Sequence, residues 1–81
     1  MPRVRYFAQA REAAGTGAEE LPGATVGEVL AAAVDRHGDR LAAVLANSAV
    51  WLDGEPCDPG DPVAIGGEVA VLPPVSGGFS G

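Results

Sequence analysis

The chain contains no lysine, and its five basic residues are all arginines. Eleven acidic residues outnumber them, so the net charge is −6 at pH 7. Because a negatively charged chain repels phosphate backbones, no nucleic-acid partner is expected, and a partner with a basic docking surface is favoured. The alternative interpretation is that the acidic excess only keeps a small domain in solution. Composition alone leaves both interpretations open.

Cysteine is represented by Cys57 alone, which excludes an internal disulfide and is typical of a reducing compartment. The chain has no apolar run near the ~20 residues that a membrane-spanning helix needs. A signal-peptide pattern is also missing. We therefore expect a cytoplasmic protein with no membrane partner.

Residues that could act as a nucleophile, a neutral-pH base or a soft metal ligand are scarce. His37 and Cys57 share no spacing motif, and Asp58 beside Cys57 would raise the pKa of the thiol rather than activate it. A structural role is favoured for His37. The carboxylates show no paired spacing, and the glycine pairs match no phosphate-binding pattern. We expect no metal, no cofactor and no catalytic activity of the chain by itself.

The 81 residues are enough for one domain, and 47% of them are hydrophobic. Many of these are alanines, so a core must depend on a few large side chains. The candidates are Tyr6, Phe7, Leu21, Leu30, Leu41, Leu45, Trp51, Leu52, Ile65 and Leu72.

The first third of the chain predicts two strands around a short helical turn. Residues 2–8 alternate in polarity, which indicates a half-buried strand with Phe7 on the face opposite Tyr6. A helical turn is expected over 11–14, followed by a short strand over 18–22.

The main helix is expected to begin after Thr25, because Glu28 three residues later completes a capping-box pattern. Gly38 is placed to end this helix as a left-handed C-cap. Residues 40–46 repeat the helical spacing in a shorter segment. The apolar stripe of the main helix consists of Val26, Val29, Leu30, Ala33, Val34 and His37.

The second half predicts a strand through Val50 and Leu52, a turn at Asp53-Gly54, and β-like runs over 63–65 and 68–72. The first strand must lie beside the last if one helix is to cover the sheet. The expected fold is α+β, a single β-grasp (ubiquitin-like) domain over 1–75 with a mixed sheet and one main helix. Expected core residues are Val4, Tyr6, Val29, Leu30, Val34, Leu41, Leu45 and Leu52.

A polar, glycine-rich tail over 76–81 follows this domain. Pro73-Pro74 favours an extended segment after the last strand, because proline fixes φ and cannot continue a helix. The pair Gly77-Gly78 has the smallest possible cross-section and could thread a narrow channel in another protein. Glycine-rich composition is equally typical of a disordered terminus. The stiff lead-in favours a delivery arm.

Two segments, "VRYFAQAREAAG" and "EVAVLPPVSGG", resemble the small subunit of molybdopterin synthase, the MoaD family. The matching residues are Tyr6-Phe7-Ala8, Ala10-Arg11-Glu12, Thr25-Val26 with Leu30, and the run 72–78. The related carriers for thiamine synthesis (ThiS) are usually shorter and lack the Ala-Arg-Glu segment and the Pro-Pro pair, whereas the cysteine-synthesis carrier (CysO) keeps the general plan. Sulfur delivery for cysteine or thiamine synthesis remains the alternative.

The resemblance implies a sulfur carrier for molybdenum cofactor synthesis. An activating enzyme of the ubiquitin-activating type would adenylate Gly78, and a sulfur donor would convert it into a thiocarboxylate. Molybdopterin synthase's large subunit would then receive the sulfur and supply the catalytic residues. The reacting end is Gly77-Gly78. The residues implied in partner binding are Phe7, Arg11, Leu72, Pro73, Pro74, Val75 and Ser76.

The chain departs from the family pattern in two places. Gly66-Gly67 replaces an Asp-Gly-Asp segment before the last strand. Residues 79–81, Phe-Ser-Gly, follow Gly78 and leave it no carboxylate. Removal of Phe79–Gly81 by a JAMM-type protease is the favoured explanation. A ubiquitin-like protein modifier joined through Gly78, and an interaction domain with an inert tail, are the other hypotheses.

Overall fold

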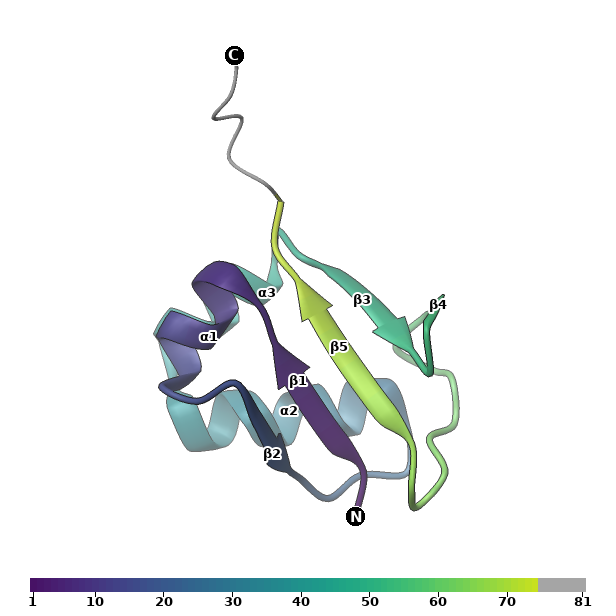
Figure 1. Cartoon of the computed structure of the whole chain (residues 1–81). Helices are drawn as coiled ribbons and strands as arrows, with labels where there is room; N and C mark the ends of the chain where they lie inside the picture. The colour runs from purple at the N-terminus through teal and green to yellow at the C-terminus, as the bar shows by residue number, and fades with distance from the viewer. Residues whose placement is uncertain (75–81) are drawn as a thin grey trace.

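The computed structural model describes residues 1–74, and the predictions for Val75, Ser76, Gly77, Gly78 and Phe79–Gly81 lie outside this part. Strands and helices follow one another in an order close to the expected one (Figure 1). The elements are β1 (Arg3–Tyr6), α1 (Ala8–Ala14), β2 (Ala18–Glu20), α2 (Val26–His37), α3 (Asp39–Leu45), β3 (Ala49–Leu52), β4 (Glu55–Pro56) and β5 (Glu68–Leu72).

One mixed sheet organises the chain, with strand order β2-β1-β5-β3-β4. β1 and β5 pair in parallel at its centre, and the three other pairings are antiparallel. The first strand therefore lies beside the last, as predicted. Together with the covering helix, this topology confirms the expected α+β β-grasp fold.

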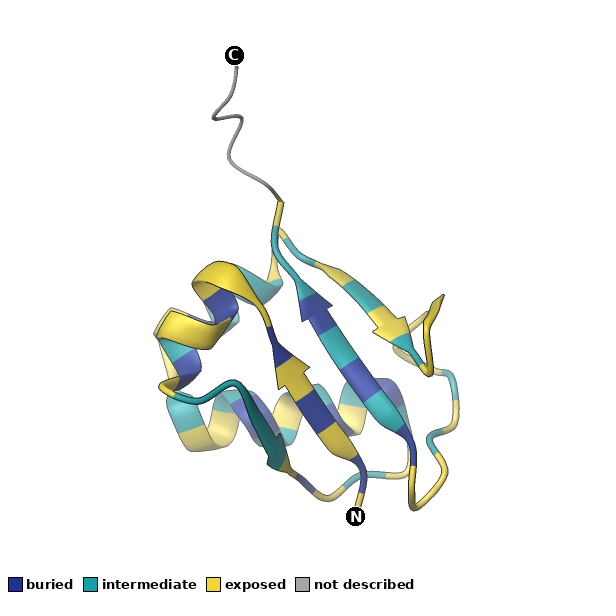
Figure 2. Ribbon diagram, in the orientation of Figure 1, coloured by how far each residue is buried: buried dark blue, intermediate teal, exposed yellow. Residues whose placement is uncertain are grey.

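The helices lie on one side of the sheet, and α2 crosses behind β1 and β5 in Figure 1. β1 accordingly alternates between buried and exposed residues and β5 between buried and half-buried ones, which Figure 2 shows as bands along both strands. Among residues 1–74 no helix is long and apolar enough to cross a membrane. The buried core consists of Val4, Tyr6, Ala10, Ala14, Leu21, Val26, Val29, Ala33, Leu41, Val69 and Val71.

The hydrogen bonds that cap the main helix are close to the predicted ones. The Thr25 hydroxyl accepts a hydrogen bond from the Glu28 amide at 3.2 Å. The Glu28 carboxylate accepts from the Ala24 amide at 2.9 Å, one residue before the position of a standard capping box. At the other end Gly38 has φ of +87°, and its amide donates to the Val34 carbonyl at 2.7 Å. Thr25 therefore caps α2 as predicted, whereas Gly38 ends the helix with ψ of −166°, outside the left-handed helical conformation expected of it.

Several core predictions were wrong in degree, since Leu30, Leu45 and Leu52 pack against the buried core but stay partly exposed. Of the eight residues predicted as core, four are fully buried and the other four are only half-buried. The half-buried residues are Leu30, Val34, Leu45 and Leu52.

The segment before β5 contradicts the prediction of a strand over 63–65. Ile65 is 81% exposed, and this segment is a loop. The Val63 amide donates to the Ala24 carbonyl at 2.9 Å, which ties the loop to the start of α2 instead of to a neighbouring strand. β3 pairs with β5 on one side and, on the other, with the short β4 directly after the turn at Asp53-Gly54.

We expect Leu41→Ala to cost ~2–5 kcal/mol of the free energy of unfolding, because Leu41 is completely buried and its removal leaves a cavity. Leu30→Ala should cost less, since half-buried Leu30 leaves a space that solvent can fill. Urea denaturation of the two variants and the parent measures the difference. Equal losses would contradict the packing described here.

Candidate functional site

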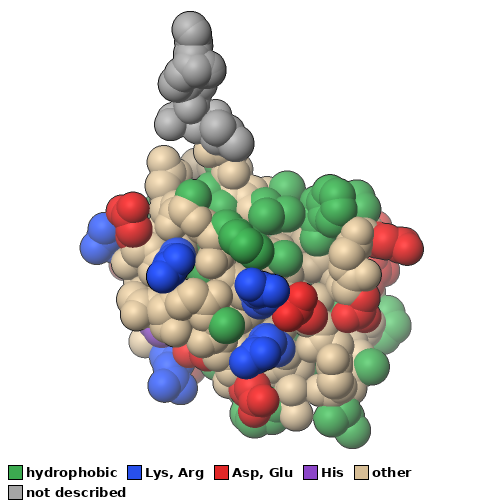
Figure 3. Space-filling model, viewed as in Figure 1, with side chains coloured by type: hydrophobic (Ala, Val, Ile, Leu, Met, Phe, Trp, Pro, Cys, Tyr) green, Lys and Arg blue, Asp and Glu red, His purple; other side chains and the backbone are tan. Residues whose placement is uncertain are grey.

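The face of the sheet away from the helices carries the outward residues of three adjacent strands. We call it the open face. Alternation on β1 points Arg3, Arg5 and Phe7 to this face, and Phe7 is 38% exposed. Figure 3 shows hydrophobic side chains gathered over the upper parts of β5 and β3, with arginine side chains beside them over β1. The outward residues of the other two strands are Ala49, Trp51, Glu68, Ala70 and Leu72.

The strand register brings Phe7 beside the end of β5. Tyr6 is paired with Val71, and the Phe7 amide donates to the Val71 carbonyl at 3.2 Å. The next step of this register sets Phe7 next to Leu72. Ala8 then turns the chain into α1 with φ of +50°, a conformation that costs a non-glycine residue ~1–2 kcal/mol. The predicted outward placement of Phe7 is confirmed.

The chain leaves the sheet toward the tail at the end of β5. Leu72 and Pro73 are half-buried, and Pro74 is exposed. β5 pairs with β1 on one side and with β3 on the other, so the direction in which the chain leaves the sheet is set by two strand partners. Leu72 thus lies where the open face meets the start of the tail, and its part in partner binding stays a prediction.

Arg11 lies on α1, in the last turn of that helix. Its guanidinium group passes over the backbone of Gly17, where an added Cβ would lie 3.7 Å from the Arg11 Nε. The side chain borders a shallow cavity between α1 and the loop that leads to β2, together with Thr16 and Glu12. Arg11 therefore follows Phe7 closely in the chain, but its side chain lies at this cavity, which is separate from the open face.

Trp51 is the residue that sequence analysis missed. It was counted as a core candidate, yet it is 37% exposed and points to the open face. The missed signal was the alternation of β3: because Val50 and Leu52 face the helices, the residue between them must face outward.

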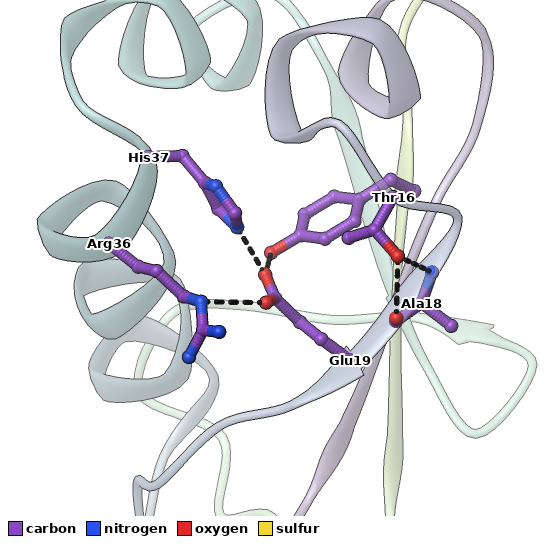
Figure 4. Close-up of polar contacts among 6 residues, drawn as sticks. Thr16, Ala18, Glu19, Arg36 and His37 are labelled. Atoms are coloured by element: carbon purple, nitrogen blue, oxygen red, sulfur yellow. Dashed lines mark hydrogen bonds and ion pairs between the residues drawn. The ribbon is translucent and has the colours of Figure 1, made fainter.

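On the helix side, Glu19 of β2 holds a polar cluster that the sequence did not predict (Figure 4). Its carboxylate accepts from the Tyr6 hydroxyl at 2.6 Å and lies 2.5 Å from His37 Nε2. Arg36 Nε lies 3.2 Å from the other carboxylate oxygen. This cluster joins β1, β2 and the last turn of α2, so the structural role expected of His37 fits its position.

The cluster shifts the pKa values of its members. Desolvation raises the pKa of Glu19, but the hydrogen bonds with Tyr6 and His37 and the charges of His37 and Arg36 outweigh it and lower the pKa overall. Burial and the neighbouring Glu19 raise the pKa of the Tyr6 hydroxyl. Tyr6 therefore remains a donor and Glu19 an anion, which is a stable pairing rather than an acid–base couple.

Cys57 is half-buried, and its thiol donates to the Val50 carbonyl at 3.4 Å. Burial, and then the charges of Asp61 and Asp58, raise the pKa of the thiol. A protonated thiol is a poor nucleophile. Within residues 1–74 no group of three His, Cys, Asp or Glu side chains is placed to hold a metal ion.

We expect the Glu19 cluster to make stability depend on pH. Because the folded-state pKa of Glu19 is lowered, its contribution is complete above the unfolded pKa of ~4.3 and is lost as the pH falls through the folded value. Glu19→Gln should cost ~1–3 kcal/mol at pH 7, since a 13%-exposed carboxylate loses charge-assisted bonds. Its urea midpoint should approach that of the parent near pH 3.

Arg36→Ala is the control for this prediction, because the Arg36 side chain is 65% exposed and an exposed pair contributes little. A pH-independent difference between Glu19→Gln and the parent would contradict the assignment.

Comparisons with known proteins agree with the geometry. A model of the ThiS family matches residues 4–78. A search of curated proteins gives no significant match. Among solved structures, SAMP1 from Haloferax volcanii is 33% identical, with a TM-score of 0.80 over 94% of this chain and 97% of the other.

Two further similar structures are described as subunits of a molybdopterin-converting factor. One, described as a molybdopterin converting factor, subunit 1, from Pyrococcus furiosus, is 28% identical, with a TM-score of 0.78 over 91% of this chain and 97% of that one. The other is the complex of subunits 1 and 2 of the molybdopterin-converting factor from Helicobacter pylori. It matches at 22% identity, with a TM-score of 0.70 over 94% of this chain and 96% of the other, and shows the fold alone.

Proposed function

The chain belongs to the ThiS family of ubiquitin-like sulfur carriers, and from this premise we propose that it carries sulfur on the carboxyl group of Gly78 for molybdopterin synthesis. The observation that carries this proposal is the extent of the family match, which continues through both glycines and ends at residue 78. The working end of the family thus corresponds to Gly77-Gly78.

The chemistry requires only a carboxylate on this chain. One oxygen of the Gly78 carboxylate attacks the α-phosphorus of ATP, and pyrophosphate leaves. A hydrosulfide equivalent from a sulfur donor then attacks the acyl carbon, and AMP leaves with that oxygen. The resulting thiocarboxylate passes its sulfur to the pterin precursor, and water restores the carboxylate. The activating enzyme and the large subunit of molybdopterin synthase would supply the catalytic groups.

The domain's part is to present the tail. β5 is held between two strands, so the chain leaves the sheet in a fixed direction beside Phe7. Pro73-Pro74 then stiffens the first step away from the sheet. A protein that binds the open face would therefore receive the tail from a defined point, which reduces the loss of entropy when the glycine pair enters a channel.

Molybdopterin synthesis is favoured over other destinations of the sulfur by the Leu-Pro-Pro-Val-Ser-Gly-Gly run and by the similarity to the Pyrococcus furiosus subunit. A protein modifier is the second candidate, because SAMP1 from Haloferax volcanii, whose full name is small archaeal modifier protein 1, is similar to this chain at 33% identity. Both use the same tail chemistry. Since the chain has no lysine, its own side chains cannot extend such a modifier into isopeptide chains.

Whether the chain ends at Gly78 or at Gly81 should decide whether it is adenylated. The 81-residue chain should be inert in ATP–pyrophosphate exchange with the activating enzyme of the same organism, because Gly78 is in a peptide bond to Phe79. A chain that ends at Gly78 should exchange. Gly77→Ala in that chain should lower exchange without changing the urea midpoint, since the added methyl group meets the channel and not the domain. Equal exchange from both lengths would refute removal of Phe79–Gly81 by a JAMM-type protease.

The product of the same reaction separates the two candidates. With a sulfur donor present, a carrier gains the mass of one sulfur in exchange for one oxygen. With a mixture of target proteins present, a modifier forms covalent adducts that survive denaturation. If neither product forms although the activating enzyme is active, the tail is inert.

Phe7→Ala should weaken binding to the activating enzyme by at least ~1 kcal/mol and change the urea midpoint little, because the ring is partly exposed on the open face. Ile65→Ala is the matched control, since Ile65 is an exposed apolar residue before the opposite end of β5. Calorimetric titration measures both. Unfolding of Phe7→Ala, or an equal loss from Ile65→Ala, would overturn the docking role.

A further inference from the structure

Ile65 is the most exposed large apolar residue among residues 1–74, with 81% of its surface open to solvent. It lies in the segment before β5, where the chain departs from the family pattern. The Gly67 amide donates to the Ala64 carbonyl at 2.9 Å, so Ile65 stands at the tip of a tight turn. Turn tips usually carry glycine or polar residues. The turn itself therefore does not require an isoleucine.

The packing beneath this turn separates two apolar side chains. Val63 is half-buried and packs against the core. A Cβ added at Gly67 would lie 2.9 Å from Cγ1 of Val63, closer than van der Waals contact permits, so only glycine allows this packing. The turn therefore directs Val63 to the core and leaves Ile65 in solvent.

Residues 58–67, which we name the Ile65 loop, are fastened to the start of α2. The Val26 amide donates to the Asp61 carbonyl at 2.9 Å. The Gly27 amide donates to the Pro59 carbonyl at 2.7 Å. A Cβ at Gly27 would lie 3.1 Å from that carbonyl oxygen, so glycine lets the loop approach closely, although it costs a helix ~1 kcal/mol relative to alanine. The loop is therefore ordered before any partner binds, which reduces the entropy lost on binding.

The surroundings of the Ile65 loop are acidic. All five arginines lie before residue 41, and every charged residue over 41–74 is a carboxylate. The Glu68 amide donates to Asp53 Oδ1 at 2.9 Å, which brings two of these residues together just after the loop. None of the carboxylates forms an ion pair within residues 1–74, although Arg3 is the strand partner of Glu68. The carboxylates are those of Asp53, Glu55, Asp58, Asp61 and Glu68.

The loop lies at the end of β5 away from the tail. β5 runs from Glu68 to Leu72, which at ~3.3 Å per residue separates the loop from the start of the tail by at least ~13 Å. Figure 3 shows hydrophobic side chains at the lower end of the view, apart from those gathered over the upper parts of β5 and β3. A protein bound to the loop would therefore leave the start of the tail free.

We propose that the Ile65 loop is a second docking site, for a protein that presents an apolar patch bordered by arginine or lysine side chains. Ile65 packs on the apolar patch, and the carboxylates around it pair with the basic border. Charge complementarity identifies this occupant, because every charged residue over 41–74 is negative and would repel an acidic surface. The inference goes beyond the proposed function, since no step of sulfur transfer uses this loop.

A second copy of the chain is a poor occupant of the Ile65 loop. Two copies joined at this loop by a twofold axis would bring their carboxylates together between two molecules of charge −6. The partner is therefore a different, basic protein.

The probe for this site is a synthetic amphipathic peptide of leucine and lysine, whose apolar side is bordered by positive charge. Added to the 15N-labelled 81-residue chain, it should shift the amide resonances of residues 58–67 and of Asp53. It should leave those of Arg5 and Phe7 unchanged, because the arginines of β1 repel it. A matching peptide of leucine and glutamate should not shift the loop. Shifts at the open face alone, or none at the loop, would overturn the proposal.

The apolar contact is tested by Ile65→Ser. This change should raise the Kd of the leucine–lysine peptide about tenfold, because it removes the side chain at the centre of the contact. Ala64→Ser introduces the same residue at the neighbouring exposed position and should leave the Kd unchanged. Both positions are exposed, so the urea midpoints should stay near that of the parent. Equal Kd values for the two variants would contradict the role of Ile65.

The charge is tested by Asp53→Asn, since the asparagine side-chain oxygen can still accept from the Glu68 amide. The Kd of the peptide should rise about two- to threefold at low salt and less at high salt, because salt screens the lost attraction. Asp35→Asn, the same change at an exposed position near the other end of α2, is the control. An equal loss from both variants would mean that only the net charge matters and would refute a site at the loop.

The outcomes keep this inference apart from the carrier function. The peptide titration needs no activating enzyme, so it decides on the loop even if the chain fails to carry sulfur. Loss of ATP–pyrophosphate exchange by the Ile65→Ser chain ending at Gly78 would assign the loop to the activating enzyme and overturn a separate site. If Ile65→Ser changes the sedimentation of the chain alone from dimer to monomer, the occupant is a second copy, and the proposal is overturned.

Discussion

The parallel pairing of β1 with β5 is the constraint on which the rest of the structure depends. These strands are the first and the last of the sheet in sequence, and they lie together at its centre. Their register sets Val4 and Tyr6 beside Val69 and Val71 on the helix side, where all four are buried. The same register sets Phe7 beside the root of the tail on the other side. One ladder therefore builds the core and the open face together.

The two sides of β1 carry different kinds of interaction. On the inner side, Tyr6 donates to a partly buried polar cluster in which Glu19 accepts from Tyr6 and pairs with His37. On the outer side, the Arg5 guanidinium lies 5.5 Å from the centre of the Phe7 ring, and both side chains are exposed to solvent. Because neighbouring residues of a strand point in opposite directions, a single register error would exchange these roles.

Local signals explain why much of the fold was predictable from the sequence. Thr25 and Gly38 act within one turn of the helix they cap, and the alternation of residues 2–8 and of 68–72 is visible without any partner. Ile65 and Trp51 were misplaced because hydrophobicity was taken as burial; the alternation of β3 assigns Trp51 correctly, but the loop position of Ile65 depends on distant contacts. The pairing of Ala70 with Arg5 and with Trp51 requires two registers between distant segments, which no local pattern contains. The boundary predicted at residue 75 and the tail predictions remain predictions.

Closure of the sheet by its two terminal strands has a consequence for biosynthesis. Contacts between residues so far apart in sequence form late, after the intervening helices and loops exist. A growing or partly unfolded chain has neither Phe7 beside Leu72 nor β5 held between two strands. The open face is thus complete only when the last strand has joined the first, and a protein that required this face would bind only a chain that has finished folding.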